Sequence, residues 1–358
     1  MTLNSGNENR KRFRQAHVQI LLYRWTQMDS LTQLCLGAAV GYAVAGKKMG
    51  KKAILWGALA GTLPDLDFLI ALPSSDDFSC LKYHRGFSHS LLFSALGPLC
   101  IAGLAKRVYH NWKSLAWIFF WGIFTHILLD CFTSWGTQVF WPLPYRVAWN
   151  SIFIIDPLYS VPLLIGLLGA LLSRSSHKQE AWIHTALILS STYLLLALGA
   201  KTAIHFKFKA LFSNQELPVL RFSTRPTAFN ILLWSTTAET KRGYYTAWVS
   251  LLDKKQTTKL HFVPKQHELS RPFSDPKSQA LIAYTKGYYA VFPYKKGIII
   301  HDLRYGLLSD PWLNEEAFVF SYYLHHDKDG AVQLEIHNPR PKNRGELLAQ
   351  LWTRLKGI

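Results

Sequence analysis

The feature that most constrains the fold is a series of six apolar runs within the first 200 residues. They cover residues 30–46, 53–72, 88–105, 115–133, 152–172 and 183–200. A helix that crosses a bilayer needs about 20 apolar residues, and helices of soluble proteins are rarely apolar on every face. Basic pairs such as Lys47-Lys48 and Lys106-Arg107 separate the runs, as in membrane-protein loops. The pattern predicts a transmembrane domain of about six α-helices over residues 28–200 and argues against a soluble all-helical core.

The second half of the chain, residues 201–358, has the pattern of a different domain. Short β-rich runs cover residues 244–249, 287–292, 318–323 and 331–336. The dipeptide Asp329-Gly330 between the last two runs is typical of a β-hairpin turn. We therefore expect a smaller, mainly antiparallel β soluble domain that ends in an amphipathic helix near residues 345–356.

The charge balance, 40 Lys and Arg against 22 Asp and Glu, is compatible with nucleic-acid binding or with basic membrane loops. The excess is spread over both halves without a basic, aromatic face, so the expected partner is a lipid bilayer and not nucleic acid. The four cysteines form no C-x-x-C pair, so neither a disulfide framework nor a thiolate zinc site is predicted. Residues 1–27 are interpreted as a basic tail without a cleavable signal. An even number of spans predicts that both termini lie on one side, which we expect to be cytoplasmic.

Ionisable side chains inside or beside apolar runs cost about 2.5–3.5 kcal/mol each on insertion scales, and here they cluster. They are Asp65 and Asp67, then His84, Arg85 and His89, then His126 and Asp130, and finally Asp156. Because consecutive spans run in opposite directions, the acidic and imidazole groups all fall at the same membrane face. A shared pocket at that face is the simplest reason for tolerating them.

The spacing of these residues predicts a metal site. His126 and Asp130 are one helical turn apart and share a face. Pro64 should break its helix and allow Asp65 and Asp67 to turn toward one point. Imidazole with carboxylate suits Zn²⁺, Mn²⁺ or Fe²⁺ better than Ca²⁺ or Mg²⁺. We expect one or two divalent ions, zinc foremost. The predicted ligands are Asp65, Asp67, His84, His89, His126 and Asp130.

Catalytic roles follow from the same hypothesis. Asp67 or Asp156 would act as general base, and Arg85, with Arg146, would hold a substrate anion. Competing interpretations are that Asp156 before Pro157 is a helix N-cap, and that Arg85 faces lipid headgroups. At the level of function, the alternatives are an intramembrane metal or proton transporter or channel, and a non-enzymatic membrane scaffold. Polar groups gathered at one face, instead of through the full thickness, favour the hydrolase.

Several stretches in one order resemble a family of bacterial inner-membrane proteins, the YdjM/YbcI-like membrane-bound metal-dependent hydrolases. The stretches are residues 28–33, 61–67, 84–90, 125–130, 132–138 and 154–159, with 225–230 and 302–306 similar to longer members that carry a soluble carboxyl-terminal domain. The resemblance implies metal-dependent hydrolysis in the inner membrane. The position of the site at the membrane face predicts an ester or phosphoester that is lipid-linked or amphiphilic.

Overall fold

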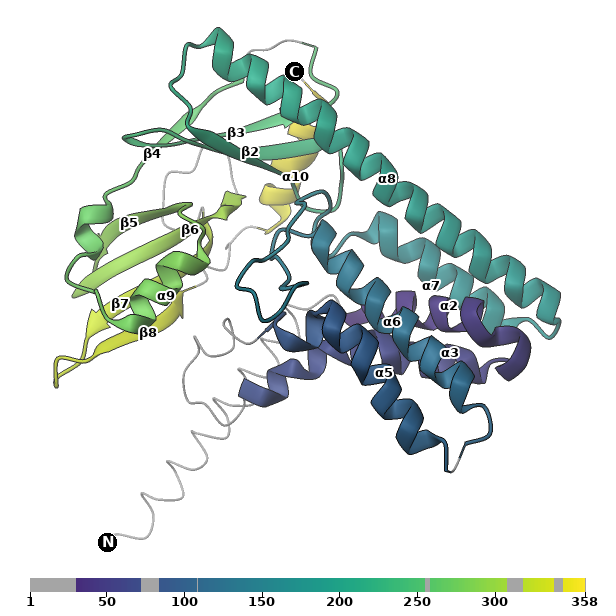
Figure 1. The fold of residues 1–358 in the computed structure, drawn as a ribbon. Helices are drawn as coiled ribbons and strands as arrows, with labels where there is room; N and C mark the ends of the chain where they lie inside the picture. Colours follow the sequence, from purple (N-terminus) through teal and green to yellow (C-terminus); the bar gives the residue numbers. More distant parts are fainter. Residues whose placement is uncertain are drawn as a thin grey trace, which may run out of the picture. The chain divides into compact units, whose positions relative to one another are not determined.

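The computed structural model describes residues 30–71, 84–107, 109–254, 258–307, 318–337 and 344–357. The basic tail expected at residues 1–27 lies outside the described residues. Within them, helices occupy the amino-terminal part of the chain and two antiparallel sheets follow (Figure 1). This order agrees with the expected change from a helical domain to a β-rich one.

Each predicted apolar run contains a helix. The helices are α2 (Ser30–Met49), α3 (Lys52–Thr62), the 3-10 helix η1 (Pro64–Ala71), α5 (Leu91–Ala105), α6 (Trp112–Phe132), α7 (Pro157–Leu172) and α8 (Ser176–Asn214). By length and composition, α6 and α8 are able to cross a membrane, whereas α5 and α7 are shorter apolar helices. The expectation of about six spans is therefore supported for two of the described helices only. One reason is that Pro64 divides the second run into α3 and η1.

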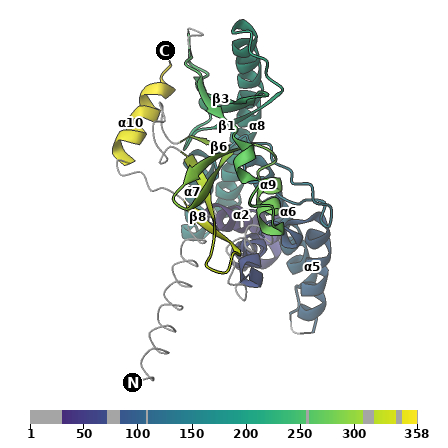
Figure 2. The same ribbon diagram turned by 90° about the vertical axis from the view of Figure 1, so that its left-hand side faces the viewer.

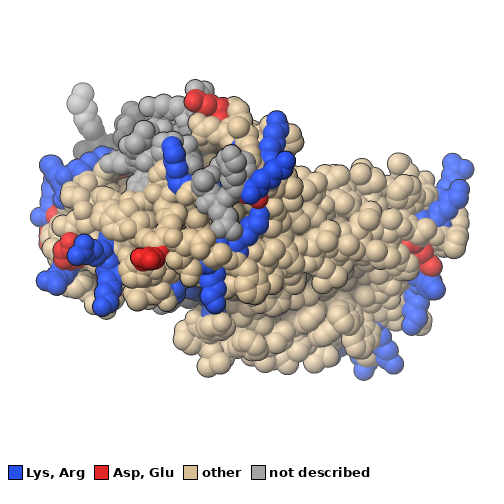
Figure 3. All heavy atoms as spheres, turned by 90° about the horizontal axis from the view of Figure 1, so that it is seen from above, with Lys and Arg blue, Asp and Glu red and all other residues tan. Residues whose placement is uncertain are grey.

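Helix α8 is the longest apolar element. Its residues 181–200 contain no Asp, Glu, Lys or Arg, and 20 helical residues extend about 30 Å, the thickness of a bilayer core. Large side chains on this stretch are exposed, including Ile188 (65%) and Leu195 (68%). Figure 3 shows a face that is mostly free of charged side chains over the helices. Such exposure suits contact with lipid.

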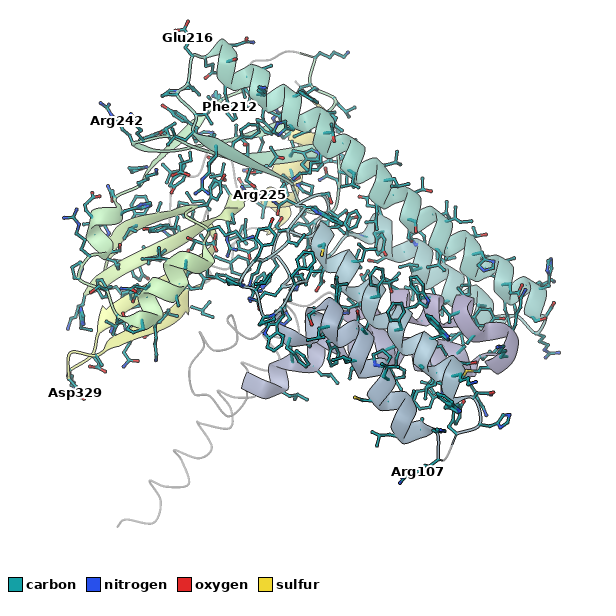
Figure 4. The ribbon with its side chains drawn as sticks, viewed as in Figure 1. Arg107, Phe212, Glu216, Arg225, Arg242 and Asp329 are labelled. Atoms are coloured by element: carbon teal, nitrogen blue, oxygen red, sulfur yellow. The ribbon has the colours of Figure 1, made fainter. Side chains whose placement is uncertain are left out.

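The helix continues 14 residues past the boundary expected at residue 200 because its last turns belong to a different core. There Phe208 and Phe212 pack against Trp234 of the first sheet, and Figure 4 labels Phe212 above that sheet. The end of the apolar run therefore does not mark the end of the helix.

Close packing of α2 on α3 follows from their glycines. A Cβ on Gly37 or Gly57 would overlap the backbone of the opposite helix, and Gly41 and Gly61 are equally tight. Small residues in this pattern let two helix backbones approach closely. The packing fixes the end of α3, where the candidate site begins.

Two four-stranded sheets form the second half of the described chain. The first contains β1 (Arg221–Pro226), β2 (Leu233–Glu239), β3 (Gly243–Ser250) and β4 (His261–Pro264) in that order. The second contains β5 (Tyr289–Tyr294), β6 (Gly297–Leu307), β7 (Phe318–His326) and β8 (Val332–His337). All neighbouring strands are antiparallel. The predicted turn at Asp329-Gly330 joins β7 to β8, with Gly330 at φ +80°.

Short helices complete this part. Helix α9 (Pro276–Tyr284) covers one face of the second sheet (Figures 1 and 2), with Leu281 in its core. The 3-10 helix η3 (His267–Ser270) precedes it. Helix α10 (Arg344–Leu355) matches the predicted terminal helix. Arg354 ties it to the first sheet by donating to the Trp248 carbonyl of β3 at 2.7 Å, and it also binds Asp253 just after that strand.

The described chain divides into two compact units. Of the described residues, one unit contains those up to Leu66, with Ser94–His126 and Leu163–Leu187, and the other contains those within Asp67–Phe93, Ile127–Pro162 and from Ile188 onward. The division passes through α6, α7 and α8, so three continuous helices belong to both units.

Candidate metal centre

Asp65 and His126 form the first of two buried imidazole–carboxylate pairs. Asp65 follows the break at Pro64, and His126 lies on α6. The His126 Nε2 atom is 3.5 Å from an oxygen of Asp65. The other ring nitrogen, Nδ1, is 2.6 Å from the carbonyl oxygen of Gly61. Because a carbonyl only accepts, Nδ1 carries a proton, and in the neutral imidazole Nε2 then presents its lone pair beside Asp65.

Small residues hold this pair in place. A Cβ on Gly122 of α6 would meet the Cβ of Ala60 on α3 at 2.6 Å, so the two helices are in close contact one turn before His126. The Gln33 amide of α2 donates to the His126 carbonyl at 3.3 Å. The three helices thus position the imidazole from both its ring and its backbone.

Asp67 is the acceptor at the centre of a second network. One of its oxygens accepts from His84 Nδ1 at 2.9 Å. The other accepts from the backbone N–H of Arg85 and the hydroxyl of Ser88, both at 3.0 Å. Arg85 has φ +58°, a conformation that is costly for a residue with a Cβ and is found mainly at functional sites. Asp67 therefore orders the residues that follow His84.

His89 and Asp130 form the second buried pair. Because the Ser88 hydroxyl donates to Asp67, its oxygen accepts from His89 Nδ1, at 2.9 Å. The His89 Nε2 atom then faces an oxygen of Asp130 at 3.4 Å. The second Asp130 oxygen is 3.0 Å from the Arg85 guanidinium, which fixes the carboxylate. This pair repeats the first: a protonated Nδ1 turned toward the protein, and a lone pair on Nε2 beside a carboxylate oxygen.

These two pairs fit a metal ion. When the imidazoles are neutral, the two facing atoms of each pair both carry lone pairs, which repel one another unless a cation, either a proton or a metal ion, lies between them. Donors bound tetrahedrally at 2.0–2.1 Å from zinc are about 3.3 Å apart, close to the distances in both pairs. One ligand atom from each of Asp65, His89 and His126 lies within 4.8 Å of the others, and all three residues are buried. Fixing Nδ1 by a carbonyl or carboxylate network is the usual way of orienting a metal-binding histidine.

The remaining predicted residues occupy other positions. Asp156 accepts from the backbone N–H of Leu158 at 3.1 Å and from the Tyr193 hydroxyl at 2.8 Å, so it is the N-cap of α7. These contacts are those of a helix cap. Arg85 is buried against Asp130 instead of facing headgroups. Arg146 donates to the His84 carbonyl at 3.1 Å through both terminal nitrogens.

Sequence reasoning missed the residues that support the ligands. Ser88 links Asp67 to His89, and Thr133 accepts from the Arg85 guanidinium at 2.9 Å. Both belong to stretches that carry the family resemblance, which was the only signal available. The role of the Gly61 carbonyl is invisible in a sequence because any residue has that group.

The fold and the buried groups define a helical protein with a histidine–aspartate centre and a β-rich carboxyl-terminal part. Residues 28–204 match the model of the YdjM inner membrane protein family. This match covers just under half of the chain, and together with the relative described next it supports the family that the motifs predicted and a place in the inner membrane.

A similar protein is the inner membrane protein YbcI of Escherichia coli (strain K12), which is 27% identical over 116 residues. The alignment covers 32% of this chain and 66% of YbcI, just under two thirds of that relative. No solved structure matches the chain.

Proposed function

We propose that this protein is a membrane-bound, metal-dependent hydrolase of ester or phosphoester bonds. The observation that carries the proposal is the repeated pair, in which an imidazole Nε2 faces a carboxylate oxygen at 3.4–3.5 Å. A divalent ion, zinc foremost, would supply a Lewis acid that makes water nucleophilic at neutral pH. Asp65, His89, His126 and Asp130 would hold it.

The protein's own groups account for orientation and proton transfer. Asp67 and the Gly61 carbonyl fix the imidazole tautomers, and Arg85 holds Asp130 through one oxygen. His84 is the most exposed of the three histidines, with 15% of its side chain accessible. Its Nδ1 proton is held by Asp67, so its Nε2 is free to accept a proton from water. We assign the general base to His84 with Asp67 as its orienting partner.

An amphiphilic substrate is supported by the surroundings of these residues. Phe87 lies between His84 and His89 in sequence and is 43% exposed. Its ring packs edge-on against Trp141, which is also exposed, at 5.0 Å. Exposed aromatic side chains of this kind sit at the level of lipid headgroups in membrane proteins. An acyl or isoprenoid chain would find an apolar surface there.

The test uses the full-length protein purified in detergent. Bound metal is measured by mass spectrometry in the wild type, Asp65→Asn and His126→Gln, and hydrolysis is measured with p-nitrophenyl phosphate, bis-p-nitrophenyl phosphate and p-nitrophenyl butyrate. We expect stoichiometric metal and chelator-sensitive hydrolysis, with both reduced at least 100-fold in the two variants. His84→Gln should keep the metal and lose turnover.

His184→Gln is the matched control, because His184 is exposed on α8. It should behave as wild type. Equal metal content in the wild type, Asp65→Asn and His126→Gln would overturn the proposal. Metal or proton flux into liposomes that depends on His126, without hydrolysis of any of the three esters, would replace the hydrolase with a transporter.

A further inference from the structure

A second group of polar side chains, of which Arg304 is buried and the other three are partly buried, joins the segment after α6 to the second sheet. It consists of Trp135 from the segment after α6, Tyr284 at the end of α9, and Arg304 and Tyr305 of β6. The Arg304 guanidinium lies over the Tyr284 ring at 4.3 Å and over the Tyr305 ring at 5.2 Å. The Trp135 ring is 5.5 Å from Tyr305 and 6.4 Å from Tyr284. The four side chains therefore form one contiguous cluster.

Each member of this cluster has a buried polar atom without a hydrogen-bond partner among the described residues. The atoms are Trp135 Nε1, the hydroxyl oxygens of Tyr284 and Tyr305, and Arg304 Nη1. The indole and the guanidinium can only donate, and the hydroxyls are able to donate. Buried donors are normally paired, so four unsatisfied atoms on one cluster of side chains require an explanation. What they share is the need for an acceptor.

The backbone of β6 creates this arrangement. Its pairing with β7 shifts register between Asp302 and Leu307, and Gly306 within the shift has φ +77°. Bulges of this kind redirect side chains and are common beside functional sites. Arg304 is then held by Asp302, whose two oxygens accept from Nε and Nη2 at 2.6–3.1 Å. Its Nη1 is left without an acceptor.

Positive charge is in excess around the cluster. Arg146 lies over the Tyr284 ring at 5.7 Å, and the Lys286 ammonium donates to the Arg146 carbonyl at 3.0 Å. Arg225, which donates to Thr237 at 2.8 Å, is buried. Arg242 at the β2–β3 turn, by contrast, is exposed (Figure 4).

Burial, together with Arg304 and Arg146, lowers the pKa of Lys286 to about 8. Burial lowers the pKa of Arg225 to about 10. Asp302 raises the pKa of both, but its two oxygens are already bound by Arg304.

The cluster is next to a residue of the candidate metal centre. The Trp135 ring is 6.4 Å from the His84 ring, and Arg146 binds the His84 carbonyl. A ligand bound by the cluster would therefore lie beside the general base of the proposed hydrolase.

We propose that Trp135, Tyr284, Arg304 and Tyr305 form an anion subsite for the phosphate group of a phosphoester substrate. This inference rests on the proposed function and restricts its substrate class. A phosphate offers three strongly accepting oxygens, enough to satisfy several donors at once. Arginine beside aromatic hydroxyl and indole donors matches such a group in charge and in hydrogen bonding.

The test removes donors without changing packing. Binding of inorganic phosphate to the full-length, EDTA-treated protein in detergent is measured by calorimetry for the wild type and for Tyr284→Phe/Tyr305→Phe. We expect at least tenfold weaker binding in the double variant, with a melting temperature equal to or above that of the wild type. Tyr245→Phe, in the first sheet, is the matched control and should bind as wild type. Measurable phosphate binding with equal affinity in the double variant and the wild type would overturn the subsite.

A second experiment distinguishes a lipid headgroup from a soluble phosphate ester. It measures binding of the same proteins to mixed micelles that contain phosphatidic acid or phosphatidylcholine. Tyrosine-dependent binding of phosphatidic acid alone identifies a lipid headgroup, and tyrosine-dependent binding of inorganic phosphate identifies a soluble ester. Tyrosine-dependent binding of neither probe overturns the inference. His126→Gln should retain phosphate binding, and the double tyrosine variant should retain its metal, so failure of the metal centre and failure of the subsite give different results.

Discussion

Two buried arginine–aspartate pairs, one beside the apolar helices and one in the second sheet, use the same chemistry with opposite consequences. Arg85 divides its donors between Asp130 and Thr133, which lie 45 and 48 residues away. It binds one oxygen of Asp130, and the other oxygen faces His89 Nε2. Arg304 instead binds both oxygens of Asp302, two residues earlier on the same strand. Its Nη1 is left without an acceptor.

The difference shows how one ion pair can prepare either kind of site. Where the arginine binds one carboxylate oxygen, the other oxygen faces an imidazole, an arrangement that suits a cation. Where the arginine binds both carboxylate oxygens, as Arg304 does, one of its own nitrogens is left without an acceptor, which suits an anion. A hydrolase of phosphoesters needs both, and in this chain His84 is near each of them.

The largest expected effect comes from removing the first arginine. Arg85→Met leaves the buried Asp130 carboxylate without its cation, which should lower the unfolding free energy of metal-free protein by about 3–5 kcal/mol. The measurement is denaturant unfolding in detergent with EDTA. Arg107→Met is the control, because Arg107 is exposed. Recovery in Arg85→Met/Asp130→Leu would identify the unpaired charge as the cause, and wild-type stability of the single variant would refute the role assigned to Arg85.

Metal addition tests whether the imidazole–carboxylate pairs hold a cation. At a free zinc concentration 100 times the Kd, binding to the folded state alone adds about 2.7 kcal/mol of stability. The thermal transition of wild type should rise with zinc and return with chelator, whereas His89→Gln should respond weakly and His184→Gln normally. An equal rise in His89→Gln would mean that zinc binds elsewhere.

A buried histidine of the second sheet, His301, should make the stability of the protein depend on pH. His301 Nδ1 pairs with the Ser321 hydroxyl at 2.7 Å and its ring stacks on Phe318 at 3.8 Å. Burial, with a further contribution from His337, lowers its pKa to about 3. The unfolded chain takes up this proton near pH 6.5, and the folded chain does not. Stability is therefore fully present above pH 6.5 and falls as the pH decreases, by about 2 kcal/mol at pH 5.

The measurement compares the unfolding free energy at pH 7 and pH 5 in the wild type and His301→Gln. Other titrating groups contribute equally to both proteins, so the difference between the two pH slopes reports His301. Identical slopes would show that His301 is protonated as easily in the fold as outside it.

The sequence predicted the helices, the β-rich half and the break at Pro64 because apolar length, strand composition and proline act locally. It also selected Asp65, His89 and His126, because charge inside apolar runs is costly whatever surrounds it. It did not predict the length of α8, whose last turns are fixed by contacts with the first sheet.

The sequence also could not predict the anion cluster, because contacts between distant segments form it. Trp135, Tyr284 and Arg304 are separated by up to 169 residues and belong to a loop, a helix and a bulged strand. Nothing in the sequence indicates a bulge at Asp302 or predicts that these three side chains meet. Packing between distant segments decides such a cluster.

The smallest effect concerns a single hydroxyl of the Asp67 network. Ser88→Ala removes the group that accepts from His89 Nδ1 and donates to Asp67, without emptying a large volume. Loss of a group that orients a metal ligand weakens metal binding about 10–100-fold, and we expect the lower end because the Asp67 carboxylate remains 3.3 Å from Nδ1. The measurement is competition with a zinc chelator of known affinity.

Ser90→Ala is the matched control, because this hydroxyl binds the Phe87 carbonyl and the Phe93 amide in the same segment and touches no predicted ligand. Ser88→Thr should restore zinc affinity by restoring the hydroxyl. If both alanine variants lose the same affinity, the serine only shapes the loop. If only Ser88→Ala loses zinc affinity, the Ser88 hydroxyl holds the proton on His89 Nδ1, and Nε2 is thereby directed toward the Asp130 carboxylate.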